Sequence, residues 1–235
     1  MERVVIAFGG SVLAPERLEA DRLAAVADRV AAWAVGRRLV LVVGGGHVAR
    51  RYIEAGRALG AQEDALDEVG IAATRLNATL LAAALRQRGL DVAPTRPSVP
   101  VTIEEAAAAS ERHAVVVMGG TVPGHSTDFV GASIAQAVGA ARFVIATNVD
   151  GVYTADPRKD PEAKRLDHVG HEELLAIVGG GTWAQAGAPG VVDGPASRLL
   201  AETGMEAAVV QGQDLDAVGA AATGAPFRGT RIGGA

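Results

Sequence analysis

Five short runs of apolar residues constrain the fold of this chain more than any other feature. None shows the alternation of apolar and polar residues that is typical of a half-exposed strand, and segments of helical periodicity separate them. The runs are Val4–Phe8, Leu39–Val43, Ala114–Met118, Phe143–Thr147 and Ala207–Gln211. Strands buried on both faces of a parallel sheet have this pattern. We therefore predict an α/β fold in which helices cover both faces of a mainly parallel central sheet.

Two of the intervening segments carry a single apolar stripe each. The first stripe is Leu23, Val26, Val30 and Trp33, and the second is Leu66, Val69, Ala73, Leu76 and Leu80. Spacings of three and four residues predict a helix with one apolar face in both places. The first face is expected to pack in the core. The second fits a core face and a subunit interface equally well, and Gly89 is expected to end that helix.

Two segments interrupt this order. Residues 91–100 contain three prolines, which predicts an irregular connection or a short edge element. Residues 152–172 are polar and include two Asp-Pro pairs. A surface excursion explains the second segment, but its position after a strand also fits a lid or the rim of a ligand site. A change of character near residue 140 predicts two lobes, 1–140 and 141–235, within one domain.

Composition excludes several classes of function. The chain has no cysteine, so a disulfide scaffold, a cysteine-ligated zinc site and a cysteine nucleophile are all excluded. The net charge of -5 and an aromatic content of 3% disfavour nucleic-acid binding. No stretch reaches the roughly 18 apolar residues of a membrane span. We expect a cytoplasmic protein without membrane or nucleic-acid partners.

The strand ends point to a binding site. Polar loops containing glycine follow the first four runs: Gly9-Gly10-Ser11, Gly44-Gly45-Gly46-His47, Gly119-Gly120-Thr121 and Asn148-Val149-Asp150-Gly151. Ligands of open parallel sheets bind outside the carboxyl ends of the strands. Glycine lets backbone N–H groups turn towards an anion, and the helices that follow add their positive ends. One pair alone could be only a tight turn, but several together predict a site for more than one phosphate group.

Charged side chains near these loops supply further candidates. Arg50 follows Gly46 by one helical turn and can reach back to a phosphate, whereas Arg51 is expected to be a surface residue. His125 fits a general base, but transfer between two phosphates needs none, so a binding role is the better interpretation. The sequence lacks the P-loop, the GxGxxG fingerprint, the GxSxG elbow and the HExxH pair.

Five motifs together resemble one known family. They are GGSVL (9–13), VVGGGHVARRYI (42–53), GIAATRLNATLL (70–81), MGGTVPGHSTD (118–128) and TNVDGVYTADPRKDP (147–161). In this order they are similar to the amino acid kinase superfamily, and most similar to archaeal-type uridylate (UMP) kinases. The resemblance runs from residue 4 to the GTRI at 229–232. It implies a three-layer αβα sandwich forming a single domain.

The resemblance also implies an activity and an assembly. The expected reaction is direct in-line transfer of a phosphoryl group from ATP to UMP, giving UDP for pyrimidine biosynthesis without a covalent intermediate. The resemblance also implies Mg²⁺ carried with the nucleotide, and no metal-ligating residues of the protein are predicted. The expected oligomer is a homohexamer built as a trimer of dimers. The N-terminal lobe would bind UMP and form subunit contacts, and the C-terminal lobe would bind ATP.

Site residues follow from the same resemblance. The ATP-binding residues would be Gly9, Gly10, Ser11, Gly46, Arg50, Thr147, Asn148, Tyr153 and Asp156. The UMP-binding residues would be Gly45, Asp67, Thr121, Val122, Pro123, Gly124, His125, Ser126 and Thr127. Arg50 and Asp128 are the catalytic candidates, with Asp128 helping to position magnesium or the phosphates.

Some positions depart from the family pattern and keep other functions open. Ala7 and Phe8 stand where many members carry a lysine, so the cation that lysine would supply has to come from elsewhere. Arg198 stands where a lysine is expected, which leaves its role undecided. A kinase acting on isopentenyl phosphate, which would use a histidine such as His47, or on a carboxylate is the alternative. A noncatalytic nucleotide- or oxyanion-binding protein is a second, and an oxidoreductase a remote third.

Overall fold

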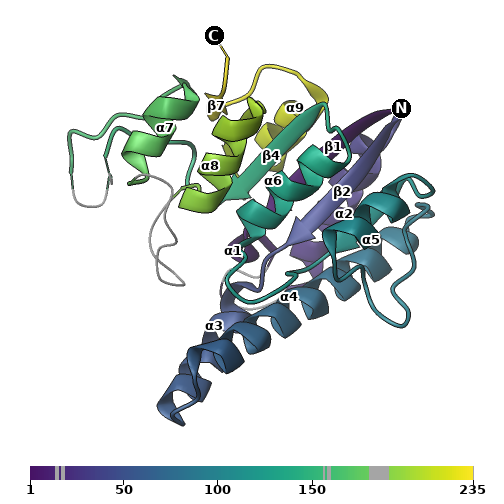
Figure 1. The fold of residues 1–235 in the computed structure, drawn as a ribbon. Coiled ribbons are helices and arrows are strands. Elements are labelled where there is room, and N and C mark those ends of the chain that lie inside the picture. Colours follow the sequence, from purple (N-terminus) through teal and green to yellow (C-terminus); the bar gives the residue numbers. More distant parts are fainter. Residues whose placement is uncertain (14–15, 17–18, 156, 158–159, 180–190, 235) are drawn as a thin grey trace.

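A single mixed sheet forms the centre of the molecule (Figure 1). The computed structural model describes residues 1–13, 16, 19–155, 157, 160–179 and 191–234. Within them the strands are β1 (Glu2–Phe8), β2 (Arg37–Val43), β3 (Val115–Met118), β4 (Arg142–Thr147), β5 (His168–Val169), β6 (Ala207–Gln211) and β7 (Thr230–Ile232). Their order across the sheet is β3-β2-β1-β4-β6-β7-β5.

The five predicted strands are confirmed, and so is the mainly parallel sheet. Neighbouring strands are parallel throughout the series β3, β2, β1, β4 and β6, and only β6 and β7 pair antiparallel. Two strands at one end of the sheet, β7 and the edge strand β5, have no counterpart among the apolar runs. They have two and three residues, too few for an apolar pattern to be visible in the sequence.

Helices connect most of the strands. In the described part of the chain they are α1 (Gly10–Leu13), α2 (Ala20–Trp33), α3 (Gly46–Ala58), α4 (Glu63–Arg86), α5 (Ile103–Ser110), α6 (Thr127–Ala137), α7 (His171–Ile177), α8 (Gly194–Thr203) and α9 (Leu215–Thr223). Local sequence sets the ends of several of them. Asp193 caps the N-terminus of α8 by accepting from Ala196 N, and Gly204 ends this helix in the left-handed conformation, φ 65°.

The helices form one layer on each face of the sheet. Side chains of β1 alternate between the two faces: Val4, Ile6 and Phe8 pack with α2, α9 and the C-terminal half of α4, whereas Val5 and Ala7 pack with α5, α6 and α8. The predicted three-layer αβα sandwich is confirmed. Each fully buried Val, Leu or Ile contributes about 1.5–3 kcal/mol, so these two cores dominate the stability of the fold.

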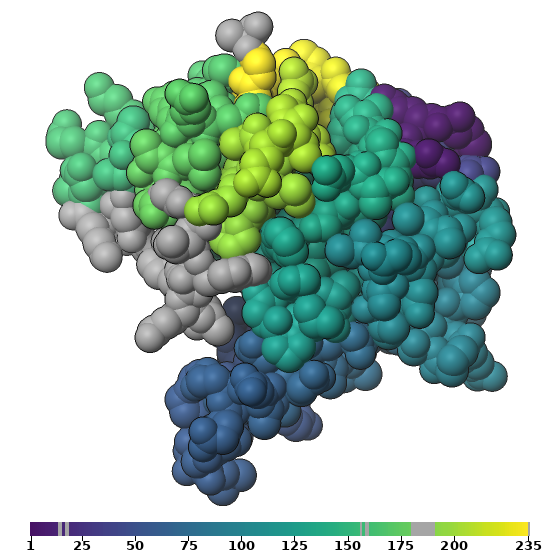
Figure 2. All heavy atoms as spheres, in the orientation of Figure 1, coloured from purple at the N-terminus to yellow at the C-terminus, as the bar shows by residue number. Residues whose placement is uncertain are grey.

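Helix α4 only partly belongs to this core. Its first turns pack on α3, and the two helices project together from the body of the molecule, as the blue arm in Figures 1 and 2 shows. On the predicted apolar stripe, Leu66 and Ala73 are buried, but Leu76 is 62% and Leu80 40% exposed. Gly89 does not cap the helix as expected, because α4 ends at Arg86 and Gly89 closes the next turn with φ 74°.

The irregular segment 91–100 is confirmed. It meets the sheet at a bridge between Val92 and Val115 at the start of β3, and Ala93 and Val99 are buried in the two cores. None of the helices in the described part of the chain combines the length and the apolar character that crossing a membrane requires.

Candidate functional site

The carboxyl ends of β1, β2, β3 and β4 bring the predicted loops to one edge of the sheet. The chain passes from β1 to β2 and β3 on one side and then returns to β4 on the other side of β1, which creates a switch point in the strand order. Gly9 N donates to Ala146 O of β4 at 2.8 Å, and Gly44 N donates to Phe8 O at 2.9 Å. The loops after these three strands therefore touch directly.

Glycine is required where these loops meet. A Cβ atom on Gly10 would lie 1.9 Å from Gly46 N, and one on Gly44 would lie 2.5 Å from Gly10 N and 3.2 Å from Thr127 Oγ1. Gly46 also has a positive φ, 62°, at the first residue of α3. The backbones of the loops after β1 and β2 thus come together without side chains between them, as a cradle for anions requires, and the Thr127 hydroxyl lies beside them.

The loop 121–127 lies over the start of α4. Gly124 N donates to Asp67 Oδ2 at 2.9 Å, and Gly124 adopts a φ of 83° that side chains disfavour. The structure thus brings Asp67 to this loop. Val122 and Pro123 are exposed at its tip.

His125 is held within the same loop. Its Nδ1 lies 3.1 Å from Thr121 Oγ1, and its ring packs edge-on against Phe129 with 4.7 Å between centroids. Burial lowers the pKa of His125 below its ordinary value, so the imidazole is mainly neutral at pH 7. A neutral ring with one nitrogen next to Thr121 is suited to hydrogen bonding rather than to charge pairing.

The first turn of α6 meets the first turn of α8. Ser126 caps α6 by accepting from Phe129 N at 3.0 Å, and its hydroxyl also donates to Asp193 Oδ2. Burial, and then the charge of Asp193, raise the pKa of Asp128 to about 7, although the Asp193 backbone N–H opposes this by donating to the Asp128 carboxyl. Asp193 lies in the DGPASR segment and was not among the predicted site residues. An aspartate followed by a proline at the start of a helix is a typical N-cap pattern, and this pattern could have identified Asp193 in the sequence.

Three further residues that sequence reasoning missed lie on α4. The side chains of Thr74 and Arg75 make hydrogen bonds to the backbone of the loop 119–121, and the side chain of Asn77 makes hydrogen bonds to the backbone of the loop 44–46. Asn77 is buried within a helical stripe of apolar residues, and a polar residue at such a position is the sequence feature that could have identified it.

The loop after β4 is organised by Asp150. Tyr153 Oη donates to Asp150 Oδ1 at 2.8 Å, and Arg228 and Arg165 pair with Asp150 Oδ2 at 3.1 and 3.4 Å. Burial alone would raise the pKa of Asp150, but these partners outweigh it and hold the pKa below its ordinary value. The hydroxyl of Tyr153 is therefore engaged within the loop, and the pKa of Tyr153 rises chiefly through this hydrogen bond.

The other predicted ATP residues surround the same loops. Thr147 O accepts from Gly212 N at 2.7 Å and Asn148 O accepts from Gln211 Nε2 at 3.3 Å, so the loop after β6 lies alongside. Ser11 lies in α1, and its backbone oxygen accepts from Gln213. Asp156 lies outside the described residues.

The two neighbouring arginines of α3 are both exposed. Arg50 lies one turn after Gly46, and the Cα–Cβ bonds of a helix tilt towards its N-terminus. Gly45 is the N-cap residue of α3. Among the described residues no three His, Cys, Asp or Glu side chains come together as a metal site.

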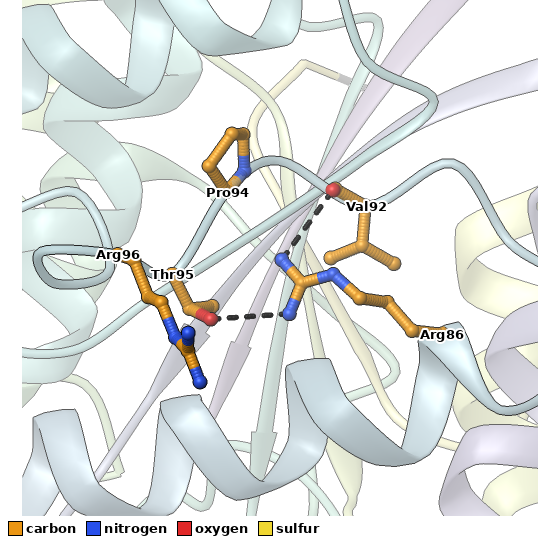
Figure 3. Close-up of a pocket in the computed structure, with 5 residues that line it drawn as sticks. All are labelled: Arg86, Val92, Pro94, Thr95 and Arg96. Carbon is orange, nitrogen blue, oxygen red and sulfur yellow. Dashed lines mark hydrogen bonds between the residues drawn. The ribbon is translucent and has the colours of Figure 1, made fainter.

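A pocket of about 320 Å³ lies away from these loops (Figure 3). It is lined by Arg86, Val92, Pro94, Thr95 and Arg96. Arg86 crosses it and donates to Thr95 Oγ1 at 3.1 Å and to Val92 O at 3.5 Å. Val92 pairs with the first residue of β3, whereas the glycine loop follows the last residue of that strand. The pocket is thus at the opposite edge of the sheet.

Comparison with known sequences gives consistent matches over the full chain. The model of the amino acid kinase family matches residues 2–211. The uridylate kinase of Natronomonas pharaonis is 42% identical over 232 residues, which cover 98% of each chain. The uridylate kinase of Haloarcula marismortui is 42% identical over 231 residues, again covering 98% of each.

Solved structures agree with these matches. The crystal structure of uridylate kinase from Archaeoglobus fulgidus superposes with a TM-score of 0.85 at 38% identity, covering 99% of this chain and 100% of that one. The UMP kinase of Bacillus anthracis superposes with a TM-score of 0.80 at 20% identity, covering 99% and 96%. The second match concerns the fold alone.

Proposed function

Because this chain belongs to the amino acid kinase family and groups within it with archaeal uridylate kinases, we propose that it transfers the γ-phosphoryl group of ATP to UMP, giving UDP. One observation carries the proposal: the glycine loops after β1 and β2 approach each other backbone to backbone, and the Thr127 hydroxyl at the start of α6 lies next to them. Two phosphate groups held by such loops would be neighbours, as in-line transfer requires.

The chemistry needs positioning and neutralisation of charge rather than a base. The UMP phosphate is already an anion, so no proton has to be removed before it attacks. Backbone N–H groups and the positive ends of α3 and α6 would stabilise the charge spread over the transferred group. Arg50, which is exposed one turn behind Gly46, would supply the cation that the position before Gly9 lacks.

UMP would lie against the loop 121–127. The carboxylate of Asp67 accepts hydrogen bonds and suits the ribose hydroxyls or the uracil N–H, and Gly45 would provide backbone contact. The lowered pKa of His125 supports a role as a neutral hydrogen-bonding group for phosphate or sugar. Thr121, Val122, Pro123, Gly124, Ser126 and Thr127 complete this acceptor loop.

ATP would lie across the ends of β1 and β4. Gly9, Gly10, Ser11 and Gly46 would face its phosphates, and Thr147, Asn148, Tyr153 and Asp156 its adenosine. Mg²⁺ carried on the phosphates would neutralise part of their charge. The carboxyl groups of Asp128 and Asp193 fit such an ion, because Mg²⁺ keeps several waters and takes one or two carboxylates beside phosphate oxygens.

The same proposal extends to assembly and location. The lobe 1–140 would bind UMP and associate with other subunits, and the lobe 141–235 would bind ATP. The exposed Leu76 and Leu80 on α4 support a dimer contact through this helix, within the homohexamer that the family resemblance implies. The expected location is the cytoplasm.

A direct assay tests the proposal. Purified protein is supplied with ATP and Mg²⁺, and ADP release is compared for UMP, CMP, AMP, isopentenyl phosphate and small carboxylates as acceptors. We expect UMP to give the highest kcat/KM and UDP to appear in equal amount to ADP. Turnover on a carboxylate or isopentenyl phosphate with UMP inert would refute the proposal, and nucleotide binding without ADP release would identify a noncatalytic binder.

A further inference from the structure

Asn77 connects helix α4 to the loop after β2. Its Nδ2 donates to Gly44 O at 3.0 Å and to Gly45 O at 3.2 Å, and the residue is only 3% exposed. A buried amide is costly unless it is hydrogen-bonded, and here one amide group bonds two successive carbonyl groups. Those two bonds fix the direction in which the peptide groups of the loop point.

Thr74, one turn earlier on α4, lies between the two glycine loops. Its Oγ1 accepts from Gly120 N and donates to Ile71 O, both at 2.6 Å. A Cβ atom on Gly119 would lie 2.5 Å from Thr74 Oγ1, and one on Gly45 would lie 3.6 Å from Thr74 Cγ2. The two loops therefore approach this one side chain from opposite sides.

Arg75 holds the second loop by its carbonyl groups. Its Nε donates to Gly120 O at 3.2 Å and its Nη2 donates to Thr121 O at 2.9 Å. The planar guanidinium makes these bonds in a fixed geometry, unlike a flexible ammonium group. Together with Thr74, it holds both the N–H and the C=O of Gly120.

We propose that Thr74, Arg75 and Asn77 form a clamp on α4 that sets the distance between the loop 44–46 and the loop 119–121, so that Arg75 and Asn77 are positioning residues for phosphoryl transfer. The inference rests on the proposed function in that these loops hold the two phosphates. A displacement of about 1 Å between reacting groups can lower the rate by about a hundredfold. Because α4 fixes the distance between the two loops, it would also fix the distance between the two phosphates and thereby the rate of transfer.

Asn77→Asp tests the first half of the clamp. The substitution keeps the shape of the side chain but places an oxygen where the Nδ2 donor lies, facing the carbonyl oxygens of Gly44 and Gly45. We expect kcat to fall by about a hundredfold. We also expect the backbone amides of residues 44–46 to exchange their hydrogens faster in the ligand-free protein, whereas those of the central strand β1 keep their protection.

Arg75→Met tests the second half. It preserves much of the side-chain length and removes the donors to Gly120 and Thr121. We expect the KM for UMP to rise by about tenfold and the KM for ATP to stay unchanged, with faster exchange confined to residues 119–122. Thr79→Ala is the matched control, because the Thr79 hydroxyl donates to Arg75 O of its own helix at 2.8 Å and the residue is exposed. It should leave exchange and kinetics unchanged.

The outcomes separate the clamp from its premise. The clamp would be supported if hydrogen exchange becomes faster only in the loop that each variant releases, with a lower kcat in Asn77→Asp and a higher KM for UMP in Arg75→Met. Unchanged loop exchange and kinetics in folded variants would overturn it, as would a uniform loss of protection across β1 and both loops. If the wild-type protein does not phosphorylate UMP, the proposed function fails, but the exchange measurement still reports whether α4 holds the loops.

Discussion

The two faces of α4 between residues 74 and 80 differ in an unusual way: beside Ala78, which packs in the core, the inner face carries polar side chains and the outer face carries leucines. On the inner face Asn77 is buried and Thr74 half-buried, and both are hydrogen-bonded to glycine loops. On the outer face Leu76 and Leu80 are exposed and belong to neither core cluster of the described residues. A surface helix ordinarily turns its apolar stripe inwards. Hydrogen-bonded polar residues inside and exposed leucines outside fit our proposals that one face organises the site and that the other contacts a second subunit.

The largest effect is expected on the outer face. We predict that Leu76→Glu together with Leu80→Glu weakens self-association by about a hundredfold or more, because burial of each leucine contributes about 1.5 kcal/mol or more and a glutamate resists desolvation. Sedimentation velocity over a concentration series measures the change. The double variant should remain folded, because neither side chain belongs to a core cluster.

Val35→Glu is the control for this experiment. Val35 is 74% exposed in the turn between α2 and β2, so the substitution adds a charge of the same kind elsewhere on the surface. Its association should equal that of the wild type. A wild-type protein that is monomeric at every concentration would refute the interface and leave the outer leucines without a partner.

A smaller effect is expected on the inner face, at Asp67. This residue lies two turns before Thr74 on α4 and accepts from Gly124 N at 2.9 Å. Asp67→Asn removes the charge and half of the acceptor capacity, so we predict a rise of about tenfold in the KM for UMP with the KM for ATP unchanged. Steady-state kinetics with each substrate varied in turn measure this. An effect on ATP alone would assign Asp67 to the other half of the site.

The sequence predicted those parts of the molecule that follow from local pattern. Buried strands show as apolar runs and α2 shows as an apolar stripe, so β1, β2, β3, β4, β6 and the layers followed directly. The glycine loops met at one edge because parallel strands share their carboxyl ends. Those steps needed only the period of hydrophobicity and the direction of the strands.

The parts that were missed depend on contacts between distant residues. Nothing near Asn77 in the sequence indicates that it would bond Gly44, and Asp193 meets Ser126 only because α6 and α8 pack together. The stripe on α4 could not be assigned to core or interface, since both require the same spacing of leucines. Only the solvent exposure of Leu76 decided that it lies outside the core.

An effect of a different kind, on stability and not on kinetics, concerns the end of the acceptor loop at Ser126, which is hydrogen-bonded to Asp193 at the start of α8. The pKa of Asp128 is raised to about 7 by burial and by Asp193. A carboxyl group with a higher pKa in the folded state binds its proton more tightly there, so the free energy of unfolding should fall as the pH rises from about 4 to about 7 and then level off. The slope from this group is at most about 1.4 kcal/mol per pH unit.

Asp128→Asn isolates this contribution. The variant should lose that part of the pH dependence, as urea unfolding of the ligand-free, metal-free protein between pH 5 and pH 8 would measure. In Asp193→Asn, where Asp128 is still present, the fall in the free energy of unfolding should end at a lower pH, because the variant removes the charge that helps to raise the pKa of Asp128. A slope identical in Asp128→Asn and the wild type would show that other groups cause it.

The smallest effect is expected where α3 and α4 are joined at the surface. Arg57 pairs with Glu63 at 3.0 Å, but their side chains are 55% and 69% exposed. We predict that Arg57→Gln lowers the free energy of unfolding by less than about 0.5 kcal/mol, and that the difference disappears in about 1 M salt. The arm is held instead by apolar packing, since Leu66 is 2% exposed and approaches Gly56 closely. Thermal unfolding at low and high salt measures both Arg57→Gln and Leu66→Ala. Leu66→Ala should lower the free energy of unfolding several times more than Arg57→Gln, and its effect should not depend on salt. A larger loss of stability in Arg57→Gln than in Leu66→Ala would mean that charge holds the arm.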